Sequence, residues 1–508
     1  MQLNLHLLLP EMLVLGAALA VIVTELLLPP GRRARATAFT AFAGLAAALG
    51  LLVSGWMDGT TGSAFLLVKD GVHVTGWSVD AFSTFTRALA ATGGLLLVLL
   101  SVPYTRRMDR GHGEFYAVLL FALAGVMLVS GVGDLLSMFV CLELVTISSY
   151  VLAAFKRNDV RSTEAGLKYL VVGSVSSALL LMGIAFLFGA TGTLSLQGLQ
   201  AAVASGSPDS LLVLGATLLM VGILFKVGAV PFHVWIPDVY EGAPSPVTAF
   251  LSTASKSAGL VLLMRLAQVV LVPATGKPEA AWLWLLVVLS GLTLLLGLLG
   301  AMRQQHMKRL LGYSSIGHAG YLLAAIAATS AAGARPEQGI TAILFYLAAF
   351  FFTNLTAFAV VVLVGGSQSP AGVSPWAGLA RRSPFLALAM VLALLSLAGV
   401  PPLSGFFGKF LVLHSVVAGA SHQPLLWLVA GLGALGILIS LYFYLVWIGE
   451  MWFKDPAPEL VAQPIAVPAS TRALLWVGML AMLGMGVVMG PAYGWAQTAA
   501  RALVGSAP

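Results

Sequence analysis

Charged residues are scarce in this sequence. Lys and Arg number 26 and Asp and Glu 19 among 508 residues, so charged side chains make up 9% of the chain, whereas about a quarter is usual for a soluble domain. So few charges cannot cover a water-facing surface, and apolar residues, at 59%, run throughout the chain. The composition excludes a soluble globular fold and predicts a polytopic membrane protein.

Cysteine is nearly absent, because Cys141 is the only one. A single thiol excludes an intramolecular disulfide and a cysteine-ligated zinc or iron–sulfur site. The eight histidines show neither HExxH spacing nor a pattern typical of haem ligation. We therefore expect any redox chemistry to take place on another chain.

Fourteen apolar windows are long enough to cross a bilayer, which takes about 20 helical residues. They cover residues 8–28, 37–56, 80–102, 115–133, 135–155, 164–190, 210–230, 245–272, 281–301, 309–330, 338–364, 385–418, 425–451 and 472–491. The sequence therefore predicts an all-α membrane protein of about fourteen transmembrane helices.

Basic residues between the windows are strongly biased to one side. Sixteen lie in segments that follow odd-numbered windows, and four lie in segments on the other side. Because cytoplasmic loops carry the excess of Lys and Arg, we expect the sixteen in the cytoplasm and both termini on the outer, periplasmic side. Membrane topology thus accounts for the net charge of +7, and no nucleic-acid partner is predicted.

One short segment has the alternation of a strand pair. Residues 65–68 and 72–77 flank Lys69, Asp70 and Gly71, and an Asp-Gly pair is typical of a tight hairpin turn. The segment is too short to span a membrane, so we predict a β-hairpin on the outer surface. An irregular loop is the alternative.

The seventh and twelfth windows each combine helix breakers with a lysine. Lys226 precedes Pro231, and Lys409 follows Pro401 and Pro402. Proline in a helix interior removes a backbone donor, and such a break persists in a membrane only where protein or water satisfies the freed groups. Broken helices in two halves of a transporter are typical of ion sites. A structural kink beside a lysine that reaches the interface is the alternative.

The two broken windows are five helices apart. Since five is odd, a second copy of a five-helix unit would be inverted in the membrane, so windows four to eight and nine to thirteen are predicted to be two inverted repeats. The predicted domains are an N-terminal unit at 1–114, a first repeat at 115–272, a second repeat at 280–453 and a C-terminal helix at 471–508.

Several ionisable residues fall inside the windows, where each costs about 2.5–3.5 kcal/mol or more. The basic ones are Arg87, Lys168, Lys226, Lys256, Arg265 and Lys409, and Glu143 is the acid near the middle of a span. Desolvation disfavours a buried ammonium and a nearby carboxylate favours it, so Lys226 and Lys256 are predicted to load and release protons with Glu143 as the carboxylate. His233 and His318 could bridge gaps in such a row. Alternatively, each is an interior or loop histidine whose hydrogen bonds are satisfied and which has no role in proton transfer.

Four strings together resemble one family. They are LLPE at 8–11, LELVTISSYVLAAF at 142–155, VPFHVWIPDVYEGAPSPVT at 230–248 and YSSIGHAGY at 313–321. They resemble the antiporter-like membrane subunits of respiratory complex I, the proton-pumping NADH:quinone oxidoreductase. Lys256, where L- and M-type chains typically carry His, and Lys409, where M-type chains carry Glu, point to the N type. The absence of a long amphipathic helix after Trp495 argues against the L type.

The resemblance implies a role for each buried ionisable residue. Glu143 would pair with Lys226, and Lys168 would modulate that pair. Lys256 would be the central lysine of a hydrophilic axis, and Lys409 would stand at the outward exit. His233 and His318 would connect these groups in the proton relay.

The family also implies a function for the whole chain. It would be a proton-translocating subunit in a bacterial cell membrane, coupled to quinone reduction in other subunits. NADH, FMN, iron–sulfur clusters and quinone would be bound by those subunits, with no cofactor or metal on this chain. The expected partners are other membrane-arm subunits and lipids. An Mrp-like cation/proton antiporter subunit and a structural subunit with inert charges are the alternatives.

Overall fold

The computed structural model describes residues 2–69, 72–205, 210–268, 280–331, 335–365, 374–461 and 465–505, and most of them are helical. Thirteen helices within this part of the chain are long and apolar enough to cross a membrane. Twelve of them are α1 (Leu9–Leu27, continuing η1, Leu5–Leu8), α2 (Pro30–Met57), α3 (Ala81–Thr105), α4 (His112–Val129), α5 (Leu135–Ala153), α6 (Val160–Thr191), α8 (Ser210–Val227), α12 (Ala280–Met302), α13 (Met307–Thr329), α14 (Pro336–Val364), α18 (Leu426–Phe453) and α20 (Ala469–Val487). The thirteenth consists of α10 (Ser245–Phe250), a π-helical turn η2 (Leu251–Ser255) and α11 (Lys256–Leu266).

The remaining helices are shorter. They are α7 (Leu196–Ser205), α9 (Trp235–Gly242), α15 (Leu379–Arg382), α16 (Pro384–Ala398), α17 (Ser404–Ala420), α19 (Pro458–Val461) and α21 (Met489–Gly505). The all-α membrane fold is confirmed. The apolar window at 385–418 is divided between α16 and α17, which are each shorter than a full span.

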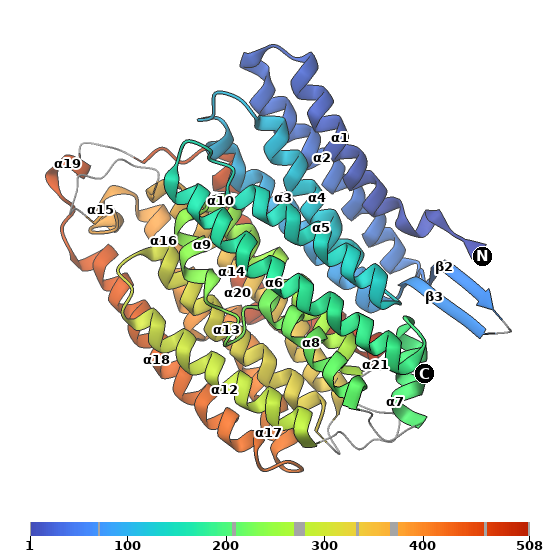
Figure 1. The fold of residues 1–508 in the computed structure, drawn as a ribbon. Coiled ribbons are helices and arrows are strands. Elements are labelled where there is room, and N and C mark those ends of the chain that lie inside the picture. Colours follow the sequence, from blue (N-terminus) through green and yellow to red (C-terminus); the bar gives the residue numbers. More distant parts are fainter. Residues whose placement is uncertain are drawn as a thin grey trace.

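Helix α14 runs through the centre of the bundle (Figure 1). It packs against α13, α16, α17 and α20, and also against α3 from the N-terminal part of the chain. In the most apolar stretch of α14, 94% of the residues are buried, and α13 has the same share. In the helix formed by α10, η2 and α11, every residue of the corresponding stretch is buried. The polar residues of these three helices are therefore shielded from the surroundings, and polar residues at such a depth are candidates for a functional site.

The predicted hairpin is present as β2 (Gly62–Lys69) and β3 (Val72–Val79), paired antiparallel. A two-residue strand that the sequence did not suggest, β1 (Gln2–Leu3), adds to the edge of β2. The Asp70-Gly71 turn lies outside the described residues. The hairpin, α7 and both chain ends lie at one end of the bundle, and α15 and α19 lie at the other (Figure 1).

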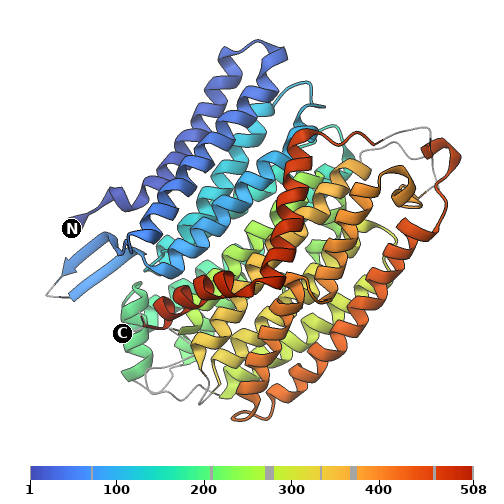
Figure 2. The same cartoon turned by 180° about the vertical axis from the view of Figure 1, so that it is seen from behind.

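The C-terminal segment corrects one expectation. A single helix over 471–508 is wrong, because α20 ends at Val487 and α21 begins at Met489. Pro491 has no backbone N–H and is tolerated in the first turn of a helix but not in its interior, which explains a new helix start here. Figure 2 shows α21 lying across the back of the bundle at a steep angle to α20, and α21 packs on α14 and α3.

The breaks after α8 and α16 share one backbone design. Gly228 (φ 80°) and Gly399 (φ 88°) adopt the left-handed conformation that favours glycine. The N–H of each glycine donates to the carbonyl three residues earlier, and the next N–H donates to the carbonyl of Leu224 or Leu395, five residues before it. Both helices therefore end in a Schellman motif, which satisfies their last carbonyls without continuing the helix.

Candidate functional site

Lys226 lies in the last turn of α8 and is 3% exposed. Its Nζ donates to Thr146 Oγ1 on α5 and to Tyr169 OH on α6, each at 3.2 Å. The ammonium also lies 5.7 Å from the centroid of the Tyr169 ring. Its partners are therefore two hydroxyls and an aromatic face, all formally neutral.

Glu143 lines the same small pocket as Lys226, together with Thr146 and Ser177. The carboxylate accepts from Ser177 Oγ on α6 at 2.5 Å. A direct ion pair between Glu143 and Lys226 is expected from the family resemblance but is not formed here, because Thr146, one turn along α5, takes the lysine and Ser177 takes the glutamate. The two groups face one cavity without touching.

Lys168 lies apart from this pocket, with 45% of its side chain exposed. Its Nζ contacts Glu164 and Asp238 carboxylate oxygens at 2.8 Å each. Arg309 Nη1 binds Asp238 and Glu241, also at 2.8 Å. Lys168 therefore belongs to a charge cluster that joins α6, α9 and α13, and its modulation of Glu143 and Lys226 stays a prediction.

Asp238 is the centre of that cluster. Its burial alone would raise its pKa, but hydrogen bonds from Lys168 and Arg309 outweigh burial and hold the pKa of this carboxyl below its usual value. The carboxylate is thus charged at neutral pH and ties the short helix α9, directly after the break, to its neighbours.

Lys256 is the first residue after the π-helical turn η2 and is 3% exposed. Its Nζ donates to the carbonyl of Ser315 at 2.6 Å and to Ser315 Oγ at 2.5 Å. A Cβ added at Gly228 would lie 4.0 Å from this Nζ. The α8 break therefore lies beside Lys256, although the side chain that a Cβ at Gly228 would meet first is Ile236. Short π-helical turns such as η2 are frequent at functional sites.

One face of α13 continues from Lys256. Ser315, His318 and Tyr321 are spaced at i, i+3 and i+6, so they lie along one side of the helix. His318 is buried, and its Nδ1 is hydrogen-bonded to Tyr346 OH on α14. Its ring also lies edge-on to Phe350, with centroids 5.1 Å apart.

Lys409 on α17 lies at the other end of this face and is 1% exposed. Its Nζ donates to the carbonyl of Ala398 at 3.0 Å and to Ser440 Oγ at 3.3 Å, and it lies 5.1 Å from the centroid of the Tyr321 ring. A Cβ at Gly399 would come within 3.0 Å of its Cδ. The second break thus holds a lysine as the first one does, and we call Lys226, Lys256, His318 and Lys409 the buried row.

The comparisons with known proteins match this geometry. Residues 132–437 match the family model described as NADH:quinone oxidoreductase/Mrp antiporter, transmembrane. The chain belongs to this family.

Relatives cover nearly the whole chain. NADH-quinone oxidoreductase subunit N of Moorella thermoacetica is 37% identical over 498 residues, 98% of each chain. The subunit N of Geobacillus kaustophilus is 38% identical over 491 residues, 95% of each chain. A chain of Thermus thermophilus respiratory complex I is 31% identical with a TM-score of 0.76, covering 96% of this chain and 98% of that one.

The NADH:quinone oxidoreductase/Mrp antiporter region contains the whole buried row and Glu143. His233 also lies in it, in the connection between α8 and α9, but it is only half-buried and its Nδ1 has no hydrogen-bond partner in the described part of the chain. The structure therefore brings Lys226, Lys256, His318 and Lys409 into one region with Glu143 and leaves His233 without a hydrogen bond to any of them among the described residues.

Two further intramembrane arginines in this family member have structural partners. Arg87 binds Glu11 through two hydrogen bonds of 2.6 Å and also donates to the carbonyl of Leu7. Arg265 binds Asp80 at 3.0 Å and the carbonyl of Ser130 at 2.6 Å. Both are neutralised by a fixed carboxylate, which the three lysines of the buried row lack.

Sequence reasoning missed the hydroxyl groups that contact the charged side chains: Thr146, Tyr169, Ser177, Tyr346 and Ser440. Only Thr146 carried a signal, because it lies three residues after Glu143 and so shares its helix face. The others lie on different helices from the glutamate, lysines and histidine that they bind, and nothing in a single sequence links them.

Proposed function

We propose that this chain is the N-type antiporter-like membrane subunit of a bacterial NADH:quinone oxidoreductase and that it moves protons through the buried row. One observation supports the proposal that protons move through the buried row. Three buried lysines, Lys226, Lys256 and Lys409, bind only hydroxyl and carbonyl oxygens, without an ion pair among the described residues.

Such lysines suit proton transfer because their charge is not fixed by a partner. Desolvation opposes the ammonium form, and a carboxylate that approaches restores it. Glu143 is the carboxylate that shares a cavity with Lys226, so a change of its side-chain conformation would alter the charge that Lys226 holds. Each transfer moves one proton between nitrogen or oxygen atoms and needs no electron on this chain.

The path from Lys256 to Lys409 would follow α13. Ser315 accepts from Lys256, His318 lies one turn further, and Tyr321 lies against Lys409. Imidazole both accepts and donates a proton near neutral pH, so His318 is suited to the middle of this path. Hydrogen-bonded to Tyr346, the ring has a fixed orientation in which it can take a proton from one side and pass it on.

The driving energy would come from other subunits of the assembly. NADH oxidation and quinone reduction, with FMN and iron–sulfur clusters, would take place there, and this chain would bind none of these groups. Other membrane-arm subunits are its partners. We also propose that both termini face the periplasm, since they lie at the bundle end opposite α15, which carries Arg381 and Arg382.

The repeats are part of the proposal. Residues 115–272 and 280–453 would be the two inverted five-helix units, with 1–114 and 471–508 as flanking parts. The matching Schellman motifs at Gly228 and Gly399 support this division, because they are five spans apart and stand beside the lysines.

An Mrp-like antiporter subunit is the alternative. A chain of the Mrp complex from Dietzia has a TM-score of 0.81 at 22% identity, covering 98% of each chain, which reflects a shared fold. The relatives named as NADH-quinone oxidoreductase subunits are 35–39% identical. Purification of the tagged chain from its native membrane distinguishes the two, because peripheral iron–sulfur subunits would accompany it only in the oxidoreductase.

Lys256→Ala tests the buried row. We expect an assembled complex that still oxidises NADH but pumps protons at least about tenfold more slowly, since positioned acid–base groups typically contribute 10²–10⁴-fold. Proton uptake by inverted vesicles, measured per NADH oxidised, is the readout. Lys454→Ala, at an exposed lysine paired with Glu450, is the matched control and should pump normally. Normal pumping by the assembled Lys256 variant would refute the assignment.

A further inference from the structure

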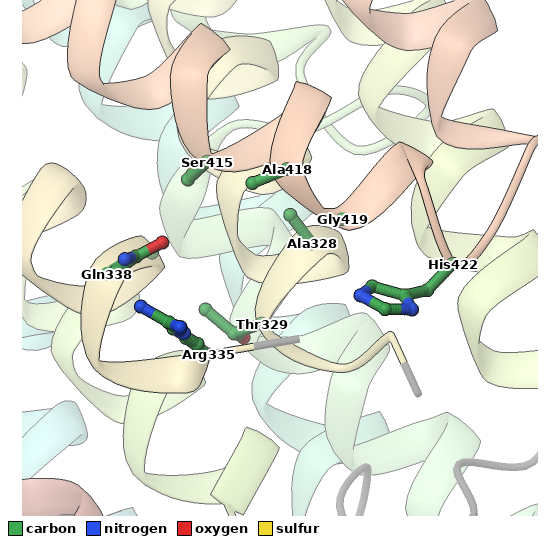
Figure 3. Close-up of a pocket in the computed structure, with 9 residues that line it drawn as sticks. Ala328, Thr329, Arg335, Gln338, Ser415, Ala418, Gly419 and His422 are labelled. Carbon is green, nitrogen blue, oxygen red and sulfur yellow. The ribbon is translucent and has the colours of Figure 1, made fainter. Parts of the chain in front are cut away.

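A cavity of about 180 Å³ lies where α13 and α17 end and α14 begins, at the side of the molecule that carries both termini. Its lining includes Thr329, Arg335, Gln338, Ser415, Ala418 and His422. Figure 3 shows Arg335 and Gln338 on one side of it and the His422 ring on the other, pointing inward. It is separate from the buried row, because Lys409 lies six residues deeper on α17 than Ser415.

The charged and polar groups of this cavity favour an anion. None of its lining residues is acidic, and no hydrogen bond or ion pair joins the Arg335 side chain to another described residue. Glu337, the acid two residues away, is occupied by Arg501 at 2.8 Å and Gln497 at 3.2 Å. Among the described residues, therefore, nothing competes with a ligand for the exposed Arg335 guanidinium.

One helix N-terminus at the cavity has the same sign. Helix α14 begins at Pro336, so its positive N-terminal end borders the space, and such ends favour anions. Helices α13 and α17 reach the cavity with their C-terminal ends, where one lining carbonyl of each accepts backbone hydrogen bonds. Ala328 O accepts from the Ala331 N–H, and Gly419 O accepts from the His422 and Gln423 N–H groups.

An exposed face of α17 carries large apolar side chains and borders the cavity lining at Ala418. Phe410 is 53% and Val417 40% exposed, and they lie seven residues apart on one side of the helix. In a membrane helix such a face contacts hydrocarbon. A cationic cavity above it combines the two features that a lipid needs, one for a charged headgroup and one for an acyl chain.

We propose that this cavity binds the phosphodiester headgroup of an anionic membrane glycerolipid. Arg335 and His422 contact the phosphate from opposite sides, Gln338 donates to the headgroup, and one acyl chain lies along Phe410 and Val417. The cavity is smaller than the 300–1,000 Å³ or so that encloses a drug-sized ligand, so it takes a headgroup and leaves the chains outside. Basic pockets between transmembrane helices bind anionic lipids in this way.

The test uses the intact complex, purified in detergent and depleted of lipid. Photoactivatable phosphatidylglycerol is added, crosslinking to this chain is quantified, and phosphatidylcholine with the same acyl chains is the comparison. We expect phosphatidylglycerol to crosslink near α17, with Arg335→Gln weakening apparent binding about tenfold, the effect of losing one charge-assisted hydrogen bond. Ala418→Leu, which fills the cavity without changing charge, should also weaken it.

Arg472→Gln is the matched control, because Arg472 is an exposed arginine at the start of α20, away from the cavity. It should bind phosphatidylglycerol normally. Equal crosslinking of the two lipids, or no effect of Arg335→Gln, would overturn the proposal. Displacement of phosphatidylglycerol by millimolar inorganic phosphate alone would also overturn it, by assigning the cavity to free phosphate. None of these outcomes depends on proton pumping.

Discussion

At the scale of single residues, the buried charges of structural residues differ from those of the proposed proton path in their hydrogen-bond partners. Arg87 is held by Glu11 and Arg265 by Asp80, so their charges are fixed and each ties two helices together. Lys226 and Lys256 bind hydroxyls and carbonyls instead. A charge without a fixed counter-charge costs more to bury, and that cost is consistent with selection for function.

Glu143→Gln is the most specific test of the carboxylate. The amide keeps the size of the side chain and can still accept from Ser177, so folding and assembly should be preserved. Removing the charge deprives Lys226 of the carboxylate that shares its cavity, and proton pumping per NADH should fall at least about tenfold. Ser177→Ala removes only the hydrogen bond and should pump better than Glu143→Gln. Equal pumping by wild type and Glu143→Gln would exclude a role for the charge.

At the scale of elements, the two breaks place the lysines. The Schellman end at Gly228 lies beside Lys256, and the same motif at Gly399 lies against the aliphatic part of Lys409. A Cβ at Gly399 would press on the Lys409 side chain, and one at Gly228 would collide with Ile236, which packs beside the first break. The helix breakers are therefore as much a part of the site as the lysines.

Gly399→Ala tests this at the second break. Alanine at φ 88° costs about 1–2 kcal/mol, and its Cβ would approach Lys409 Cδ to 3.0 Å, so the lysine must shift. We expect lower thermal stability and slower pumping together. Gly431→Ala in α18 is the control, since nothing lies within 4 Å of the added Cβ and alanine favours the helix. Unchanged pumping in Gly399→Ala would show that the break does not position Lys409.

The elements were largely predictable, and the contacts between them were not. Hydropathy marks each span because a bilayer-crossing helix needs a long apolar run, and strand alternation around residues 65–77 indicated the hairpin. The same pattern does not say which way a polar residue faces: Lys168 falls within an apolar window, yet its side chain is 45% exposed and pairs with Asp238. The Ser177 contact of Glu143 likewise depends on how α5 and α6 pack.

At the scale of the whole molecule, a charge pair links the N-terminal helices to the helix that carries Lys256. Asp80 caps α3 by accepting from the Ser83 N–H at 2.6 Å and also binds Arg265 on α11 at 3.0 Å. Arg265 in turn donates to the carbonyl of Ser130, after α4, and lies 5.1 Å from the centroid of the Phe82 ring. Arg265 thus connects α3, which lies outside the first proposed repeat, with α4 and α11, which belong to it.

A double-mutant cycle measures that connection. Arg265→Met and Asp80→Asn should each lower the unfolding temperature of the purified chain or complex, because each leaves a largely buried partner without its counter-charge. Their combination should lose less than the sum, with a coupling energy of about 0.5–3 kcal/mol, since residues in one ion-pair network are not independent. Additive losses would mean that the pair does not hold α3 to α11.

If the Asp80–Arg265 pair does hold α3 to α11, protease cleavage offers a second readout. Each single variant should be cleaved more readily in the connection between α3 and α4, at residues 106–111, because the N-terminal helices then separate more readily from the helix that carries Lys256.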